Sequence, residues 1–257
     1  MGHDAASGTL RERIAAREEL WGSFVLELPS RAAIECYALA GFDFVVLDLE
    51  HSATDLGTLS ALTTTCRAAG LACLVRIESG ATSSITRILE LAPTGVMAPG
   101  VRSAAEAGAV VHAARYYPLG RRGLAPIVRH ELEADAARGI EAREALTTVI
   151  VQLEAAEAVS EAAAVASTSG VDVVFVGPYD LSQSVGHPGQ VDHPDVVATG
   201  ERLAELVVPR AVLGVHLERP DQLARWRAAG ATLFTLRTDG RIFLDACRLT
   251  LEQFRAV

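Results

Sequence analysis

The chain has 257 residues, of which 50% are hydrophobic, so it is long enough to bury one sizeable core. Its formal net charge of −9 argues against nucleic acid as a partner, because nucleic-acid sites need clustered basic residues. No apolar run approaches the ~20 residues of a membrane span, and no secretory signal is visible, so we expect a cytoplasmic protein. The four cysteines form no CxxC pair, so we expect reduced cysteines and no structural zinc.

Short apolar runs alternate with alanine-rich stretches along the chain, which predicts alternating strands and helices. The predicted strands are residues 22–28, 44–48, 71–77, 95–99, 147–154, 171–177, 211–217 and 231–237. The predicted helices are residues 31–41, 56–70, 83–92, 103–117, 155–167, 221–230 and 242 to the end. Residues 117–146 are too long for a simple connection and predict an excursion over one face.

The predicted strands are continuously apolar rather than alternating, as is typical of a parallel sheet whose outer face is covered by helices. Eight strand–helix units favour a (β/α)8 barrel that forms a single domain over residues 1–257. A doubly wound sheet is the alternative, because eight such units do not by themselves prove that the sheet closes.

Residues of the types that enzymes use lie at or just after the carboxyl ends of four of the predicted strands. They are Asp48, Glu50 and His51 for residues 44–48, Arg76 for residues 71–77, Gln152 and Glu154 for residues 147–154, and Asp180 for residues 171–177. In a barrel of this kind the active site lies at the carboxyl ends of the strands, so these side chains would converge on one site. The alternative is that each strand end is polar only because it meets water.

The residue types suggest a division of labour. Glu154 and Asp180, from different strands, could share a divalent cation, and oxygen ligands suit Mg²⁺ or Mn²⁺, with Co²⁺ and Zn²⁺ as alternatives. His51, close to Asp48 in sequence, has the pattern of an oriented imidazole that moves protons. Arg76 offers a permanent cation for a developing oxyanion.

Several motifs that carry these residues resemble the HpcH/HpaI aldolase family, the metal-dependent class II pyruvate aldolases. The matching stretches are GFDFVVLDLEHSATD, LVRI, YPLGRRG, VQLEAAEAV and VFVGPYDLSQSVG, which occur in the family's order. The likeness covers about residues 15 to 250, and the pairing of DLEH with GPYDLS is its most specific part.

The resemblance implies a modified (β/α)8 barrel, assembled as a hexamer (a trimer of dimers) in which the C-terminal helix is exchanged between partners. The family's metal ligands match Glu154 and Asp180, and its catalytic residues match His51, Asp48 and Arg76. The implied substrates are pyruvate and an aldehyde. The implied substrate-binding residues are Arg76, Gln152, Gly177, Pro178 and Tyr179.

The implied reaction makes or cleaves 4-hydroxy-2-oxo acids through the enolate of pyruvate. The sequence contains no lysine, which excludes an aldolase that works through a lysine imine. One alternative is a citrate-lyase-β-like or malyl-CoA-lyase-like enzyme acting on a CoA thioester, although such enzymes lack the DLEH histidine. Another is a barrel that binds a keto acid without turning it over.

The last two strands depart most from the family pattern. His216 lies near the end of the seventh predicted strand, Arg219 lies just after that strand, and Arg237 is the last residue of the eighth. His216 is interpreted as a core residue, a support for the site or a contact for the aldehyde. Arg237 would either reach an acidic aldehyde or pair with a carboxylate of the protein. These differences leave the identity of the aldehyde open.

Overall fold

Eight parallel strands close into a barrel in the order of the sequence, in a computed structural model that describes residues 8–124 and 136–256. The strands are β1 (Leu20–Val25), β2 (Phe44–Asp48), β3 (Ala72–Arg76), β4 (Gly95–Ala98), β5 (Thr148–Leu153), β6 (Val173–Val176), β7 (Val212–Leu217) and β8 (Ala231–Thr238). Since β8 pairs with β1, the sheet has no edge. The predicted (β/α)8 barrel is therefore confirmed, and the doubly wound alternative is excluded.

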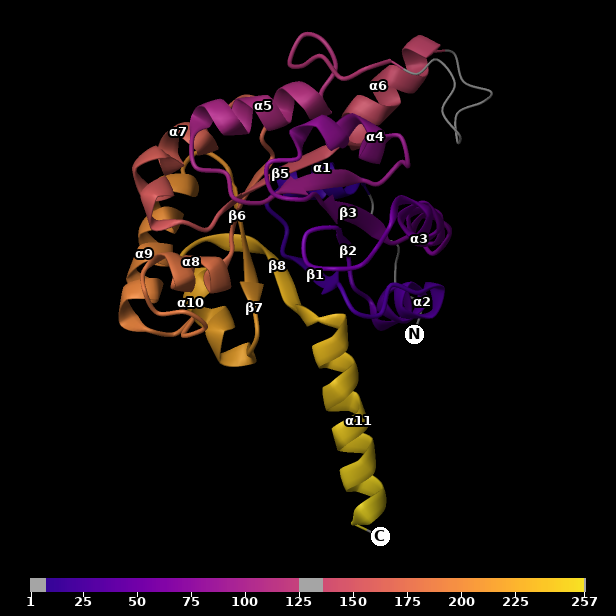
Figure 1. The fold of residues 1–257 in the computed structure, drawn as a ribbon, viewed down its shortest axis with the longest axis vertical. Coiled ribbons are helices and arrows are strands. Elements are labelled where there is room, and N and C mark those ends of the chain that lie inside the picture. Colours follow the sequence, from indigo (N-terminus) through magenta and orange to yellow (C-terminus); the bar gives the residue numbers. More distant parts are fainter. Residues whose placement is uncertain (1–7, 125–135, 257) are drawn as a thin grey trace.

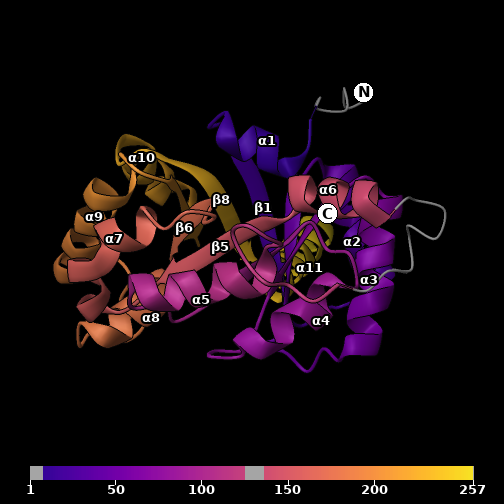
Figure 2. The same cartoon turned by 90° about the horizontal axis from the view of Figure 1, so that it is seen from above.

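Helices cover the outside of the barrel (Figure 1 and Figure 2). The helices of the described residues are α1 (Leu10–Ala15), α2 (Arg31–Ala40), α3 (Leu56–Ala68), α4 (Ile85–Leu89), α5 (Ala104–Ala114), α6 (Ala136–Leu146), α7 (Ala162–Ala166), α8 (Pro178–Ser184), α9 (Pro194–Val207), α10 (Leu223–Ala228) and α11 (Asp239–Arg255), the last of which projects away from the barrel. Several begin at a side chain that accepts a backbone N–H three residues further on; Ser30, Asp55 and Ser103 do this for α2, α3 and α5.

Apolar side chains form two layers, one inside the barrel and one between the strands and the helices. Val46 lies in the inner layer and its neighbour Val45 in the outer one, because successive strand residues point to opposite faces. The inner layer includes Phe24, Phe44, Leu74, Met97, Ile150, Phe175 and Leu233. Because both faces are apolar, the strands read as continuous apolar runs in the sequence.

The first strand ends earlier than the sequence predicts. The N–H groups of Leu26, Glu27 and Leu28 donate to the buried carboxylate of Asp239 at 3.0, 3.1 and 2.7 Å. These N–H groups are therefore held by the first residue of α11 and do not extend the strand. The same contacts tie the rim of the barrel to the base of α11.

Two of the predicted helices begin with a tighter turn. Residues 83–92 contain the 3₁₀ helix η1 (Thr82–Ser84) followed by α4, and residues 155–167 contain η2 (Ala156–Glu161) followed by α7. The third 3₁₀ helix, η3 (Pro220–Gln222), leads into α10. Of the predicted excursion, residues 136–146 form α6, and residues 125–135 lie outside the described part of the chain.

Helix α9 was not among the predicted helices. Pro194 occupies its first turn, and the side chain of His193 accepts the N–H of Asp195. Both features are start signals for a helix.

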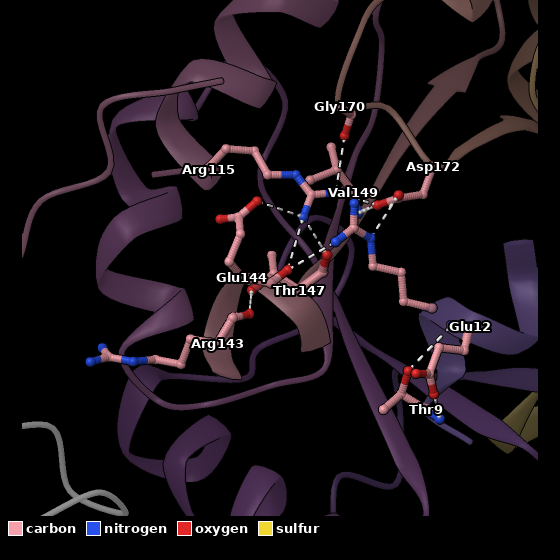
Figure 3. A network of polar contacts seen from close by, with 10 residues as sticks. Thr9, Glu12, Arg115, Arg143, Glu144, Thr147, Val149, Gly170 and Asp172 are labelled. Atoms are coloured by element: carbon pink, nitrogen blue, oxygen red, sulfur yellow. Dashed lines mark hydrogen bonds and ion pairs between the residues drawn. The ribbon is translucent and has the colours of Figure 1, made fainter. Parts of the chain in front are cut away.

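An arginine network stabilises the side of the barrel opposite the carboxyl ends of the strands (Figure 3). Arg115 is fully buried and donates to the Asp172 carboxylate, to the Glu144 carboxylate and to the backbone oxygen of Thr147. Asp172 also accepts the backbone N–H of Val149, at the start of β5. Charges at this end of the strands therefore serve the fold, as expected for the stability face of such a barrel.

The C-terminal helix α11 projects away from the barrel (Figure 1), beginning at the carboxyl end of β8. Five of its large apolar side chains are exposed: Phe243, Leu244, Leu249, Leu251 and Phe254. Within the described residues, no helix is both long enough and apolar enough to cross a lipid bilayer.

Candidate active site

A cavity of about 350 Å³ opens at the carboxyl ends of the strands. Seven of the predicted site residues line it: His51, Arg76, Gln152, Gly177, Pro178, Tyr179 and Asp180. Glu154 adjoins this wall, because its carboxylate accepts a hydrogen bond from Gln152. Asp48 is fully buried beneath Arg76. The barrel thus gathers the predicted residues at one place.

Arg76 is held by Asp48 through two hydrogen bonds. Nε donates to Oδ1 at 2.6 Å and an NH2 hydrogen to Oδ2 at 2.9 Å. The two residues are partners in the register of β2 and β3, so the sheet itself brings them together. The guanidinium also lies over the ring of Phe24, 4.7 Å from its centroid. A planar group gripped in this way can present its remaining N–H groups in one fixed direction.

His51 was expected to be oriented by Asp48, and the structure places the contact on its backbone. The His51 N–H donates to Oδ2 of Asp48 at 2.9 Å, and the Glu50 N–H donates to Oδ1 at 3.2 Å. The imidazole of His51 is 57% exposed, and its Nε2 lies 3.8 Å from Oε2 of Glu50. Asp48 therefore fixes the turn that carries His51 and does not contact the ring.

Glu50 connects His51 to Arg76. Its Oε2 lies 3.4 Å from NH1 of Arg76. Burial raises the pKa of the Glu50 carboxyl, and the positive charge of Arg76 opposes that rise. Glu50 is therefore the acid that lies between the arginine and the imidazole.

The environment of Glu154 disfavours the ionised form of its carboxyl group. Burial, followed by repulsion from Asp180, raises the pKa of Glu154 to about 7. Its Oε1 accepts the N–H of Gly100 at 2.6 Å, and its Oε2 accepts from Nε2 of Gln152 at 3.2 Å. Gly100 follows β4 with a φ of +65°, a backbone conformation that glycine adopts without strain.

Asp180 lies in the first turn of α8, facing the same cavity. It is exposed and makes no ion pair with any residue that the structure describes. Gly177, just before this helix, leaves room for Glu154, because a Cβ at that position would lie 2.7 Å from Oε2 of Glu154. The chain therefore keeps the space beside Glu154 and Asp180 free of side chains.

These residues fit a divalent metal ion. The carboxylates of Glu154 and Asp180 repel each other, and a cation between them would relieve that repulsion. Gln152, whose Nε2 donates to Glu154, has a buried Oε1 atom without a hydrogen-bond partner among the described residues. Glu154 and Asp180 are the residues that would hold the ion.

A second group of possible metal ligands lies elsewhere, in the segment before α9 and in its first turn. His187, His193 and Asp195 have ligand atoms within 4.8 Å of one another. The two imidazole rings are stacked with centroids 3.4 Å apart, so their in-plane lone pairs run side by side and do not converge on one point. None of these residues lines the cavity, which separates this group from Glu154 and Asp180.

The divergent residues of the last strands also have definite positions. His216 and Glu218 line the cavity and are hydrogen-bonded to each other at 3.0 Å. Arg237 donates to the Asp245 carboxylate and to the backbone oxygen of Glu218, so it pairs with a carboxylate of the protein. Arg219 pairs with carboxylates outside the cavity. Glu218 was not predicted as a site residue, although it lies only two residues after His216, a spacing that places both side chains on the same side of an extended chain.

A closed (β/α)8 barrel with a cavity at the carboxyl ends of its strands, lined in part by His51, Arg76 and Asp180, has the architecture of an enzyme. The chain belongs to the HpcH/HpaI aldolase/citrate lyase family, whose model matches residues 23–246. The family resemblance drawn from the motifs is thereby confirmed. Together with aldolase-named relatives, this membership supports a carbon–carbon lyase of the aldolase type, as predicted.

Individual relatives agree with this assignment. The chain is 32% identical over 254 residues to a hydroxypyruvate/pyruvate aldolase of Paraburkholderia phytofirmans, covering 96% of this chain and 97% of that one. The solved structure of an HpcH/HpaI aldolase from Desulfitobacterium hafniense matches with a TM-score of 0.89 and 25% identity, over 97% of each chain. A structure described as the citrate synthase SbnG matches with a TM-score of 0.85 and 28% identity, over 97% of this chain and 99% of that one.

Proposed function

We propose that this chain catalyses the reversible addition of pyruvate to an aldehyde, giving a 4-hydroxy-2-oxo acid, with the help of a divalent metal ion. One observation carries the proposal. Asp180 lines the same cavity as Arg76, whose guanidinium Asp48 holds in place, and the Glu154 carboxylate, which Asp180 repels, adjoins the cavity wall through Gln152. This arrangement can bind a keto acid and stabilise negative charge on its oxygen.

The protein's groups would orient pyruvate from three sides. Glu154 and Asp180 would hold the cation, which supplies Lewis-acid polarisation of the keto oxygen. The remaining N–H groups of Arg76 donate to the same oxygen as its charge develops. The N–H groups of Tyr179 and Asp180, in the first turn of α8, lack partners within the helix and would bind the carboxylate beside Gly177 and Pro178.

His51 would move the proton. The imidazole takes a proton from the methyl carbon of pyruvate, leaving an enolate whose charge rests on the oxygen facing Arg76. The methyl carbon then forms a bond to the carbonyl carbon of the aldehyde, and the aldehyde oxygen takes up a proton. Cleavage breaks the same bond in reverse, with no net oxidation or reduction. The exposed position of His51 at the cavity suits an exchange of protons with both reactants.

Oxygen ligands favour Mg²⁺ or Mn²⁺ at this site, with Co²⁺ and Zn²⁺ as alternatives. The first experiment is pyruvate methyl-proton exchange in D2O, followed by NMR on metal-stripped protein with Mg²⁺ or Mn²⁺ restored. We expect exchange that requires metal and is lost in Glu154→Ala and His51→Ala. His112→Ala, at an exposed position on α5, is the matched control. Exchange that survives in His51→Ala would overturn the role given to that residue.

A CoA-thioester lyase or synthase is the second candidate. It is favoured by the family's shared description with citrate lyase and by the likeness to a structure described as a citrate synthase. Turnover of a CoA thioester, combined with no exchange of pyruvate protons in metal-loaded protein, would establish it. A barrel that only binds keto acids would retain pyruvate affinity in His51→Ala and show no exchange before or after the change.

We also propose that α11 is exchanged between subunits of a hexamer built as a trimer of dimers. Its exposed apolar side chains support this, because an isolated projecting helix gains stability only when such side chains are buried. Phe254, near the end of the helix, is 79% exposed in the single chain. A second copy of the same chain is the occupant that would cover this face.

A further inference from the structure

The cavity has a second wall that the proposed pyruvate site leaves unused. Phe24 stands between the two walls: the guanidinium of Arg76 lies 4.7 Å from its ring centroid, and the ring of His216 lies 5.7 Å away in an edge-on contact. Glu218 and Tyr179 complete the wall around His216. A keto acid bound at Arg76 therefore leaves the His216 wall for the second reactant.

His216 holds Glu218 in a fixed orientation. Its Nε2 lies 3.0 Å from Oε1 of Glu218, and its Nδ1 lies 2.9 Å from the hydroxyl of Thr235. This hydrogen bond lowers the pKa of Glu218, so the carboxyl stays ionised and Nε2 is the donor. Because both ring nitrogens are engaged, His216 positions the carboxylate. The backbone N–H of Glu218 is fixed as well, by Oε1 of Gln222 at 3.0 Å.

The wall around His216 presents a negative charge to the cavity and no unpaired positive charge among the described residues. Oε2 of Glu218 makes no hydrogen bond with any described residue, and Glu218 lines the cavity. The arginines near Glu218 and Tyr179 are paired with carboxylates outside the cavity: Arg237 and Arg241 with Asp245, and Arg219 with Asp192 and Asp221. An incoming carboxylate would therefore meet the negative charge of Glu218 and no unpaired arginine among the described residues of this wall.

We propose that Glu218, positioned by His216, selects a neutral, hydroxyl-bearing aldehyde as the partner of pyruvate and disfavours aldehydes that carry a carboxylate. The inference rests on the proposed aldolase function and names the substrate class of the same site. A hydroxyl on the aldehyde donates to Oε2 of Glu218, whereas a methyl group in its place leaves that oxygen unpaired. The cavity, about 350 Å³, is small for a ligand site and favours an acceptor of few carbons.

The test compares three small acceptors on metal-loaded protein: glycolaldehyde, its methyl isostere propionaldehyde, and the acidic glyoxylate. Pyruvate proton exchange is measured on each protein, and each kcat/KM is divided by that exchange rate. We expect glycolaldehyde to exceed propionaldehyde by about tenfold or more, the range for a hydrogen bond to a charged group, and to exceed glyoxylate by at least as much. Glu218→Gln should reduce the first ratio several-fold and raise the relative rate with glyoxylate.

Two further variants separate positioning from general damage. His216→Ala should lower the glycolaldehyde-to-propionaldehyde ratio, and His216→Gln, which keeps an N–H donor, should restore part of it. Glu205→Gln, on the exposed face of α9, is the control and should leave the ratio unchanged.

A wild-type protein that prefers glyoxylate, or a ratio unchanged in Glu218→Gln, overturns the selection by Glu218 while leaving the aldolase function intact. If Glu218→Gln does not fold, the order of the three aldehydes in the wild-type protein and the ratios in His216→Ala and His216→Gln still test the selection by Glu218. Absence of pyruvate exchange in the wild type would overturn the proposed function itself, and this inference with it.

Discussion

Asp48 grips the guanidinium of Arg76 at two points and, with the same two oxygens, accepts the backbone N–H groups that follow β2. The pair is buried, with the Asp48 side chain fully inaccessible and that of Arg76 9% exposed. Removing one member of such a pair leaves the other charge uncompensated, so this contact controls both stability and the position of the reactive groups.

Asp48→Asn should therefore impair activity and folding together. The amide keeps the shape of the side chain but cannot accept two hydrogen bonds from Arg76, so the guanidinium loses its orientation. We expect pyruvate proton exchange to fall about 10²–10³-fold, the range for a lost oxyanion donor, and stability to fall by about 3 kcal/mol. NMR exchange and urea unfolding measure the two effects. Asp195→Asn, at an exposed position, is the control, and equal exchange rates in both variants would refute the prediction.

The metal-free protein should lose stability as the pH rises through the range set by Glu154. Its pKa is raised from 4.5 to about 7, so the folded state binds this proton more tightly than the unfolded state. The free energy of unfolding then falls between about pH 4.5 and pH 7, by up to about 3 kcal/mol. The measurement is urea unfolding in the presence of a chelator at about pH 6 and about pH 8.5. Between these pH values, the free energy of unfolding should fall less in Glu154→Gln than in the wild-type protein. An identical loss in wild type and variant would contradict the assignment.

Gly177→Ala should weaken metal binding while leaving the fold intact. The added methyl group would meet Oε2 of Glu154 at 2.7 Å and displace that carboxylate, although the backbone φ of −95° suits alanine. We expect Mn²⁺ affinity, measured by calorimetry, to fall about tenfold, the scale for disturbing a ligand's surroundings. Gly108→Ala is the control, because a Cβ there meets nothing within 4 Å. A Mn²⁺ affinity that is unchanged in Gly177→Ala would argue against Glu154 as a ligand.

Charge on the apolar face of α11 should disrupt assembly. Leu251→Asp combined with Phe254→Asp would place two carboxylates on the exposed apolar face, because residues three apart lie side by side on a helix. We expect the mass in solution, measured by light scattering, to drop from that of an oligomer to that of a smaller species. Glu252→Gln, an exposed polar change on the same helix, should leave the mass unaltered. A wild-type protein that is already monomeric would refute the exchange.

Much of the barrel and of its site follows from pattern alone. Continuous apolar runs reveal strands that are buried on both faces, and strand ends reveal where Asp48, Arg76, Glu154 and Asp180 gather. The residue that pairs with the Asp48 carboxylate was not predicted correctly. Proximity in sequence favoured the ring of His51, whereas the register of β2 and β3 places Arg76 beside the carboxylate. A buried carboxylate is stabilised better by a paired guanidinium than by an exposed imidazole.

Other features depend on contacts between distant segments. The end of β1 is set by Asp239, more than two hundred residues later, which no local pattern reveals. The significance of Glu218 depends on which arginines around it are already paired, and only three-dimensional positions show that Arg237 turns toward Asp245. The direction in which α11 leaves the barrel likewise follows from packing, not from its amphipathic pattern.

The grip of Asp239 on the chain after β1 also fixes the base of α11. Its carboxylate holds three N–H groups beyond β1 and the N–H of Gly240 within the helix, so the base cannot swivel without breaking several buried hydrogen bonds. The orientation of α11 relative to the barrel is therefore fixed at its first residues. In the proposed exchange, the orientation of α11 in one chain would therefore set the angle at which a second copy approaches.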